Sequence, residues 1–305
     1  MAITGSGTQA DPYIVHTKAE IQTACESTES VTTYVKLAND IDFKDDSVWN
    51  TPLFIGNRNN PSGIVVFDLD SHALKNIRNQ SALFQFGGDY NHQSHIKNGK
   101  ILNIFSEISN TQQTTYAPFL GNGTNQYNVR DLSISIKFFS SPNDDIRTSL
   151  VQSSHLIGCA AYLECSKCIT PVIEAAYINA CDLELHINDL NNKPISSWSG
   201  WTMGDTRVTG KISGNAMNNL FHGNYQGCQS GCVIDVDFSG ITSGGRHLFS
   251  TQGGTTLGAV NGDTLPPNAS PSGGRLDGMA VMNSQTIRNG NALRNAGFTV
   301  VNIGD

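Results

Sequence analysis

Four segments of this chain begin with similar phrases: Pro171-Val-Ile-Glu, Pro194-Ile-Ser-Ser, Asn219-Leu-Phe-His and His247-Leu-Phe-Ser. Their starts lie 23, 25 and 28 residues apart. The first three lead into runs with an apolar residue at every other position: Asp182-Leu-Glu-Leu-His-Ile, Arg207-Val-Thr-Gly-Lys-Ile and Val233-Ile-Asp-Val-Asp-Phe. Such alternation is typical of a β-strand with one buried and one exposed face.

A repeat of about 20 to 30 residues that holds short strands and no helix predicts a coiled parallel sheet. Each turn of such a coil buries its apolar face only by stacking on its neighbours. We therefore expect an all-β chain folded as a right-handed parallel β-helix (solenoid). A short helix should cap its N-terminal end, and a helix and a strand its C-terminal end. The residues expected to face the interior are Leu183, Leu185, Ile234, Val236 and Phe238.

The composition argues against several classes of partner. The chain has 305 residues and a formal net charge of −7, and no stretch gathers five or six Lys or Arg residues. Binding to nucleic acid or to an anionic membrane surface is therefore not expected. No apolar run reaches the roughly 18 to 20 residues that span a bilayer. The first residues do not form a secretory signal, which indicates assembly in the cytoplasm or an export signal that has been trimmed.

The N-terminal part of the chain has a specific order of elements. Residues 4–16 read Thr-Gly-Ser-Gly-Thr-Gln-Ala-Asp-Pro-Tyr-Ile-Val-His, and Thr17 and Glu20 then have the spacing of a capping box at the start of a short helix. An alternating strand is expected over residues 34–43. Further motifs follow in this order: Trp49, Ile55-Gly56, Phe67-Asp-Leu-Asp-Ser-His72 and Leu83-Phe84.

This order resembles the N-terminal unit of β-helical surface proteins that carry GLUG-type repeats. That family opens with Gly-Ser-Gly-Thr-x-x-Asp-Pro-Tyr and continues with a capping helix, a Leu-x-x-Asp-Ile-Asp strand and a Trp…Ile-Gly segment. Its Phe-Asp-Gly-x-x-His stretch corresponds to residues 67–72 here, with Leu69 in place of the usual Gly. The resemblance implies a bacterial adhesin, a polysaccharide-acting protein, or a bacteriophage virion protein such as a tail appendage or fibre.

The chain is expected to divide into three parts: an N-terminal cap (1–58), the coils of the β-helix (59–254), and a Gly/Pro-rich segment with a C-terminal cap (255–305). Residues 255–278 should hold no regular element, because Gly and Pro punctuate them. A helix should follow, with Asn283 or Ser284 as its N-cap and Gly297 as its stop. A strand over residues 298–303 completes the cap.

The seven cysteines are an odd number, so at least one cannot pair within the chain. Cys165 and Cys168 have the spacing of half a zinc site or of a redox pair. The remaining close pair, Cys228 and Cys232, has a longer gap and no His at ligand spacing. Cys159 and Cys181 lie about one repeat apart and should stack in adjacent coils. We favour reduced thiols that act as small apolar core residues.

Outward positions of the alternating runs hold acidic and basic side chains, namely Glu184, His186, Asp235 and Asp237. Asp235 and Asp237 should point the same way about 7 Å apart, a separation compatible with an inverting glycosidase. The alternative is that they are ordinary solvated residues. Arg207 or Lys211 could serve as the base of a lyase, but no acidic cluster for calcium accompanies them. We therefore assign no catalytic residue or metal ligand and expect no cofactor.

A candidate ligand surface lies in the turns of the repeat. Trp198-Ser-Gly-Trp201 places two of the three Trp residues in a Gly-rich turn, where indole faces could stack on sugar rings. The alternative is that both pack at a corner of the coil. Asp205 is near enough in sequence to add hydrogen bonds, and His222 and Tyr225, about one turn later, would extend the surface. The predicted ligand-binding residues are these five.

The sequence therefore favours a non-enzymatic bacteriophage protein on the virion surface, a head or tail decoration or fibre that attaches to host glycans. Its partners would be other virion proteins and a host cell-surface glycan, and a homo-oligomer such as a trimer is compatible with this role. Assembly would take place in the host cytoplasm. The alternatives are a polysaccharide depolymerase or lyase on the same fold, and a bacterial adhesin located at the cell surface.

Overall fold

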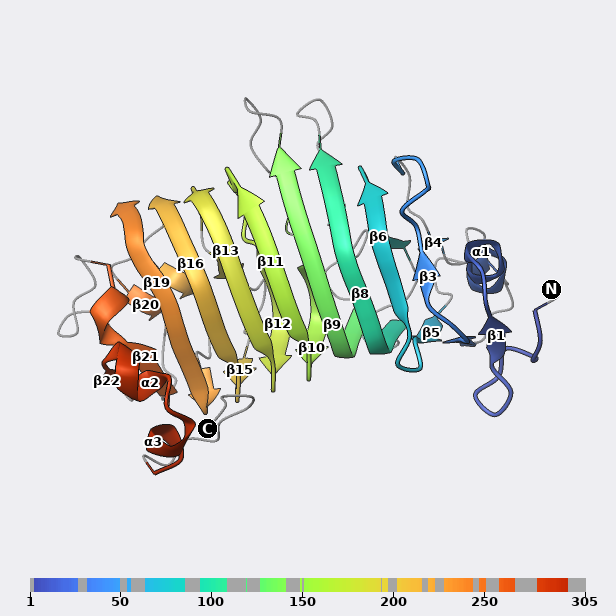
Figure 1. Cartoon of the computed structure of the whole chain (residues 1–305). Helices are drawn as coiled ribbons and strands as arrows, with labels where there is room; N and C mark the ends of the chain where they lie inside the picture. Colours follow the sequence, from blue (N-terminus) through green and yellow to red (C-terminus); the bar gives the residue numbers. More distant parts are fainter. Residues whose placement is uncertain are drawn as a thin grey trace.

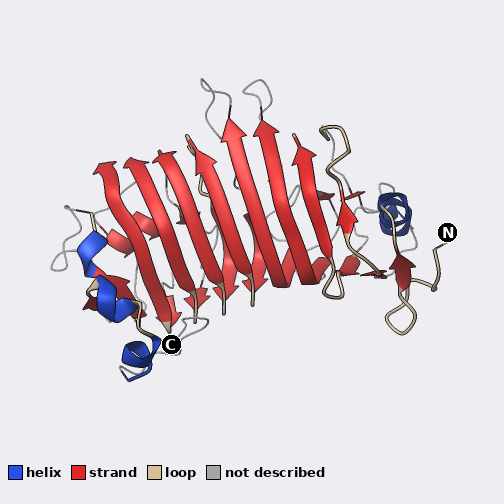
Figure 2. Ribbon diagram, viewed as in Figure 1, coloured by secondary structure: helices blue, strands red, loops and turns tan. Residues whose placement is uncertain are grey.

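A computed structural model of the chain describes residues 3–26, 32–49, 54–55, 64–85, 94–108, 119, 127–140, 149, 151–192, 194–196, 202–215, 219–222, 228–243, 247–250, 258–266 and 279–295. Within these ranges the named strands pair in parallel, which confirms the expected parallel β-helix. Figure 1 shows the strands side by side along an elongated molecule. Helices lie at the two ends of this array (Figure 2).

Each coil contributes to three ladders of parallel strand pairs. The front ladder, which is the large sheet in Figure 1, contains β3 (Ile41–Asp42), β6 (Ala73–Asn79), β8 (Ser94–Ile108), β9 (Tyr127–Ser140), β11 (Ala160–Ser166), β13 (Asp182–Leu190), β16 (Arg207–Asn215), β19 (Cys232–Ser243), β21 (Gly258–Asn261) and β22 (Met279–Met282). The second ladder contains β1 (Tyr13–Val15), β2 (Thr33–Leu37), β5 (Val65–Asp68), β10 (Val151–Ile157), β12 (Ile173–Asn179), β15 (Thr202–Gly204) and β18 (Cys228–Ser230). The third contains β4 (Phe54–Ile55), β7 (Phe84–Gln85), β14 (Ile195–Ser196), β17 (Asn219–His222) and β20 (His247–Ser250). Strands β8 and β9 bend from the second ladder into the front one, and β10 and β12 from the third into the second.

Apolar side chains fill the interior of the coils. The five residues expected to face inward are all buried: Leu183, Leu185, Ile234, Val236 and Phe238. Strand register stacks them on buried residues of the neighbouring coils, as Val208 stacks on Leu183. Full burial of such a side chain contributes about 1.5–3 kcal/mol. The buried side chains of one coil are covered by those of the coils on either side. The stability of one coil therefore depends on its neighbours.

One corner of the coil is built in the same way in successive turns. In each of six coils, one residue with a left-handed backbone lies just before the segment that enters the front ladder. Its φ is between 44° and 65°, and the six residues are Asn98, Asp131, Gly158, Ala180, Asp205 and Gly231. This backbone region is best tolerated by Gly, Asn and Asp. These residue types occupy all of the positions except Ala180, so the corner depends on sequence as well as on packing.

The N-terminal end is capped by α1 (Lys18–Glu26), as expected. The Glu20 amide donates to Thr17 Oγ1 (3.2 Å), in keeping with a capping box. The Glu20 carboxylate, however, accepts from the backbone N–H of His16 (2.7 Å). The strand expected over residues 34–43 is divided into β2 and β3, because the chain leaves the second ladder there and enters the front one.

Leu69 stands where the GLUG-type family has Gly, and it is fully buried. The left-handed residues of this turn are Asp70 and Ser71, with φ of 46° and 72°. Gly99 of the next coil leaves room for the Leu69 side chain, since a Cβ on Gly99 would lie 2.3 Å from the Leu69 Cβ. The turn therefore accommodates Leu69 through a glycine in the adjacent coil.

Parallel pairing continues on both sides of residues 59–254, through β1 and β2 and through β21 and β22. Strand β21 corrects the expectation that residues 255–278 hold no regular element. Its Gly258 and Ala259 pair in register with Cys232 and Val233. The neighbouring coil supplies ladder hydrogen bonds to this short segment, which local propensity did not reveal.

Two short helices, α2 (Ser284–Ile287) and α3 (Gly290–Asn295), replace the single helix expected near the C-terminus. Asn283 caps α2, and its side chain accepts a hydrogen bond from the Thr286 amide (2.8 Å). The strand expected over residues 298–303 lies outside the described residues. Of the helices that the structure describes, none is long and apolar enough to cross a membrane.

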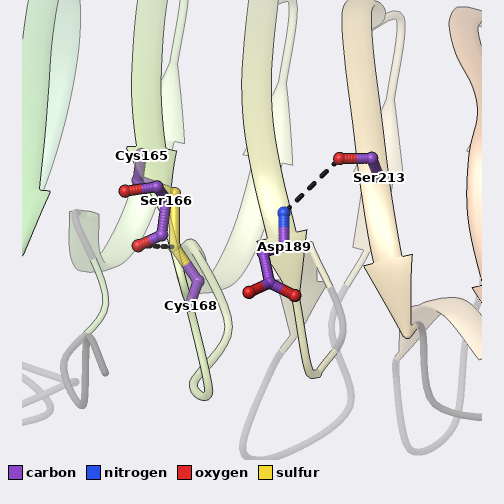
Figure 3. The surroundings of a disulfide bond; sticks show 5 residues. All are labelled: Cys165, Ser166, Cys168, Asp189 and Ser213. Atoms are coloured by element: carbon purple, nitrogen blue, oxygen red, sulfur yellow. Dashed lines mark hydrogen bonds between the residues drawn. A yellow bond between two sulfur atoms is a disulfide. The ribbon is translucent and has the colours of Figure 1, made fainter. Parts of the chain in front are cut away.

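Two of the thiols expected to be reduced form a disulfide. Cys165 and Cys168 are joined across the turn that follows β11, with their Cα atoms 6.9 Å apart (Figure 3). The left-handed backbone of Lys167 (φ 55°) reverses the chain there and brings the two side chains together. Cys232 is also disulfide-bonded. These residues correct the expectation, since the turn geometry was not evident from the spacing.

The remaining described thiols agree with the expectation. Cys25, Cys159 and Cys181 are free and buried. Cys159 and Cys181 stack in adjacent coils, where the amide of Asp182 donates to the Cys159 carbonyl (2.8 Å). The hydrogen bond between the two side chains, together with burial, holds the pKa of Cys159 well above its ordinary value.

Candidate binding site on the front sheet

The predicted ligand-binding residues are only partly described. Trp198, Trp201 and Tyr225 lie outside the described residues, and of His222 the backbone alone is described, at the end of β17. Asp205 is a corner residue with φ 44°, and a Cβ on Gly231 of the next coil would lie 2.2 Å from its Oδ1. Asp205 and the backbone of His222 occupy different corners of the coil.

A row of charged side chains crosses the solvent face of the front sheet. It takes one residue from each of five strands, paired in register: Lys137 (β9), Glu164 (β11), His186 (β13), Lys211 (β16) and Asp237 (β19). We call this set the charged row. Adjacent strands are about 4.8 Å apart, so each side chain can interact with the next. The outward positions predicted for His186 and Asp237 are confirmed.

Glu164 is held by two neighbours. Lys137 Nζ lies 3.1 Å from Glu164 Oε2, which also accepts a hydrogen bond from the Tyr162 hydroxyl (3.0 Å). The Lys137 ammonium is the main group that lowers the pKa of Glu164. Glu164 therefore stays ionised at neutral pH, which suits it to accept hydrogen bonds and makes it a poor general acid.

The His186 ring is fixed by an acidic and an aromatic neighbour. Its Nε2 lies 2.7 Å from Glu184 Oε1, and its ring packs against Tyr162 with the centroids 5.2 Å apart. Burial is the main cause that raises the pKa of Tyr162, so the phenol stays protonated at neutral pH and can donate a hydrogen bond. Together these contacts preorganise the surface between β11 and β13.

Asp235 and Asp237 point outward on β19, as predicted, but they have different partners. The Ser239 amide donates to Asp237 Oδ1 (2.9 Å), and Lys211 Nζ lies 3.4 Å from Asp237 Oδ2. Hydrogen bonds from Ser239 are the main cause that lowers the pKa of Asp237. Asp235 Oδ2 instead accepts from Arg288 Nε (2.6 Å) of the C-terminal cap. With Asp237 ionised and Asp235 bound to the cap, the pair is poorly arranged for an inverting glycosidase.

A hollow of about 430 Å³ lies at the ends of β11, β13 and β16. Its lining contains two side chains of each strand, Glu164 and Ser166, His186 and Asn188, and Lys211 and Ser213, with Cys165 and Ile187. Ser213 Oγ donates to Asn188 Oδ1 (3.0 Å) and accepts from the Asp189 amide (3.4 Å; Figure 3). Cys165 of this lining is joined to Cys168 by the disulfide (Figure 3).

The hollow combines a carboxylate, an imidazole, an ammonium, an amide and hydroxyl groups on a rigid sheet. These groups can donate and accept hydrogen bonds with a ligand rich in hydroxyl groups. In the described ranges, no group of three or more His, Cys, Asp or Glu side chains is placed to hold a metal ion. The arrangement is therefore suited to binding a polar organic ligand.

The sequence singled out His186 and Lys211 but not Glu164 or Tyr162. Both missed residues occupy outward positions of Ala160-Ala-Tyr-Leu-Glu-Cys-Ser. A usable signal was present: when successive coils are aligned on their buried apolar residues, Glu164, His186 and Lys211 fall at the same place in three coils. Alternation within one strand could not reveal this row, because it is formed between coils.

Comparison of the chain with protein-family models, with curated proteins and with solved structures gives no match. The chemistry of the site is therefore interpreted from the geometry of its own residues.

Proposed function

We propose that this protein is a non-enzymatic attachment protein of a bacteriophage virion, which binds a host glycan through the hollow on its front sheet. The hollow is the observation that supports the proposed glycan binding. It is about 430 Å³ in volume, and polar side chains of three adjacent strands line it in matching positions. A saccharide presents hydroxyl groups that these side chains can bind.

The electrostatics favour binding over cleavage. Glycoside hydrolysis requires one carboxyl group that is protonated and one that is ionised. Within the hollow, Glu164 has a lowered pKa because of Lys137, and on the neighbouring strand Asp237 has a lowered pKa because of Ser239. Ionised carboxylates are good acceptors for sugar hydroxyl groups. They cannot protonate a leaving group.

The location on a virion rests on the resemblance of the N-terminal residues 4–84 to GLUG-type β-helical proteins. A rigid coil capped at its N-terminal end by α1 suits display on a particle surface. The partners would then be other virion proteins and a host glycan, and the protein could assemble as a trimer. A bacterial adhesin at the cell surface would use the same hollow in the same way.

A polysaccharide depolymerase or lyase is the second candidate. The observation that favours it is the in-register placement of Glu164, His186 and Lys211 in one hollow, because a carboxylate, an imidazole and an ammonium are the groups used for general acid–base chemistry. Purified protein would then release reducing or unsaturated ends from polysaccharide. Glu164→Gln and Lys211→Gln would each abolish that release.

The binding proposal is tested by blocking the hollow. Asn188→Trp places a large side chain within it, whereas Ser133→Trp places the same side chain on the outer face of the same sheet, on β9 outside the hollow. Binding of the purified variants to immobilised bacterial surface polysaccharides should be lost with Asn188→Trp and retained with Ser133→Trp. Equal binding by both variants would contradict the proposed site.

Immunogold labelling of phage particles tests the proposed location on the virion surface.

A further inference from the structure

We infer that the hollow takes an acidic saccharide, whose carboxylate pairs with Lys211 while its hydroxyl groups face Glu164. This inference rests on the proposed function, since it names the class of glycan that the hollow would bind. It comes from the distribution of charge across the three strands that line the hollow. The two row residues at its ends, Glu164 on β11 and Lys211 on β16, have opposite charges.

Lys211 is able to change partner. Its side chain is 61% exposed and its Nζ lies 3.4 Å from Asp237 Oδ2, so the ion pair is a weak surface contact. Asp237 does not depend on Lys211, because it also accepts a hydrogen bond from the Ser239 amide (2.9 Å). The Lys211 ammonium can therefore turn to a ligand carboxylate without leaving a buried charge unpaired.

Glu164 does not oppose an anionic ligand as an isolated carboxylate would. Its charge is offset by Lys137 (3.1 Å), a residue that does not line the hollow. Lys137 and the Tyr162 hydroxyl both approach Oε2. In the described part of the chain Oε1 is therefore the oxygen left to accept a hydrogen bond from a sugar hydroxyl.

The two ends of the hollow are separated by two strand spacings, roughly 10 Å. Between them lie the His186 ring and Asn188, whose Oδ1 already accepts from Ser213, so its amide nitrogen is oriented as a donor. A neutral saccharide would use these hydrogen bonds alone. An acidic saccharide would add a charge-assisted bond to Lys211, which is roughly twice as strong as a neutral one.

The test uses three acidic probes with their carboxyl-reduced counterparts: oligogalacturonate, hyaluronan fragments, and α2,8-linked oligosialic acid. Their affinities for the purified full-length protein are measured by isothermal titration calorimetry. We expect at least one acidic probe to bind, and its carboxyl-reduced form to bind about tenfold more weakly, as the loss of a charged hydrogen bond implies.

The variant Lys211→Gln should lower the affinity for the acidic probe by a similar factor and leave that for the reduced form nearly unchanged. Lys100→Gln is the matched control, because it removes the same charge from the same sheet on β8, away from the hollow. Thermal unfolding checks that both variants remain folded. Equal binding of acidic and reduced forms, or equal loss in both variants, would overturn the inference while leaving glycan binding intact. Absence of binding to every acidic, reduced and surface polysaccharide would reject the proposed function as well.

Discussion

Gly210 occupies an inward position on β16, between two coils that pack closely. Its φ is 111°, and a Cβ at this position would lie 2.1 Å from the carbonyl oxygen of Leu185. Gly210→Ala should therefore lower the free energy of unfolding by about 1–3 kcal/mol from backbone strain alone, with the steric overlap adding to this. Thr209→Ala, on the outward side of the same strand, is the control and should change it little. Urea unfolding of both variants measures the difference, and equal stability would contradict the assigned packing.

The thiols give a second prediction at the scale of single residues. Burial holds the pKa of Cys25 well above its ordinary value, and Cys159 is likewise buried, so neither presents a reactive thiolate. Iodoacetamide should label both only after unfolding.

Peptide mapping without reductant should recover Cys165 and Cys168 as a linked pair. Rapid labelling of Cys165 in the native, unreduced protein would refute the disulfide.

The residues that sequence could place are those governed by local alternation. Alternation predicts that Leu183 and Ile234 are buried and that Asp235 faces outward, because neighbouring positions of a strand face opposite ways, and the structure agrees. The bond between Asp235 and Arg288 could not be predicted, since these residues are 53 positions apart. The row that joins Glu164 to Lys211 was missed for the same reason, because its order depends on the register between coils.

At the scale of elements, the C-terminal cap depends on a contact from β19 to α2 and the turn after it. Asp235 has a side chain that is 11% exposed, and it accepts two hydrogen bonds from Arg288, of 2.6 and 3.2 Å. Asp235→Asn should lower the free energy of unfolding by about 1–2 kcal/mol, because the substitution removes the negative charge and one of the two oxygens that accept from Arg288 and Asn261. Hydrogen exchange of the α2 amides should rise at the same time.

Asp237→Asn is the matched control on the same strand. An Asn Oδ1 can still accept the hydrogen bond from the Ser239 amide, and the exposed ion pair to Lys211 contributes little. Its stability and the exchange of the α2 amides should remain close to those of the parent. If the Asp237→Asn variant loosened α2 as much as Asp235→Asn, the cap would not be held by the Arg288 contact.

At the scale of the whole molecule, two partly buried histidines make stability depend on pH. Burial, with a contribution from Arg130, lowers the pKa of both His95 and His155 from the ordinary value of 6.5, and Lys97 also faces His95. As the pH falls below 6.5, the unfolded chain takes up protons that the folded chain resists. Stability that is present above pH 6.5 is therefore lost as the pH falls towards the folded pKa values.

The free energy of unfolding should thus be lower at about pH 5.5 than at about pH 7.5, and His155→Gln should reduce this difference. The variant also loses the packing of the ring against Tyr177, with the centroids 5.7 Å apart, which affects stability at both pH values. The informative quantity is therefore the difference between the two pH values. An unchanged difference in the variant would show that His155 does not contribute.

The overall architecture could be predicted because the coil repeats one local pattern many times, and an error in one turn does not alter the rest. Strand β21 and the disulfide at Cys165 were not predicted, since each depends on a contact or turn that no repeat specifies. The candidate hollow could not be predicted for the same reason, because it depends on contacts between coils. Its location follows from which coils are adjacent and which side chains end their strands.

The most direct test of the binding site is to follow the imidazole signals of the protein by nuclear magnetic resonance during titration with a bound oligosaccharide. The chain contains 8 His residues, and His186→Gln identifies the signal of the one in the hollow. We predict that the His186 signal shifts in a saturable manner and with the affinity measured by calorimetry. A His186 signal that stays unchanged at saturating ligand, while signals of other histidines shift, would place the binding site elsewhere on the molecule.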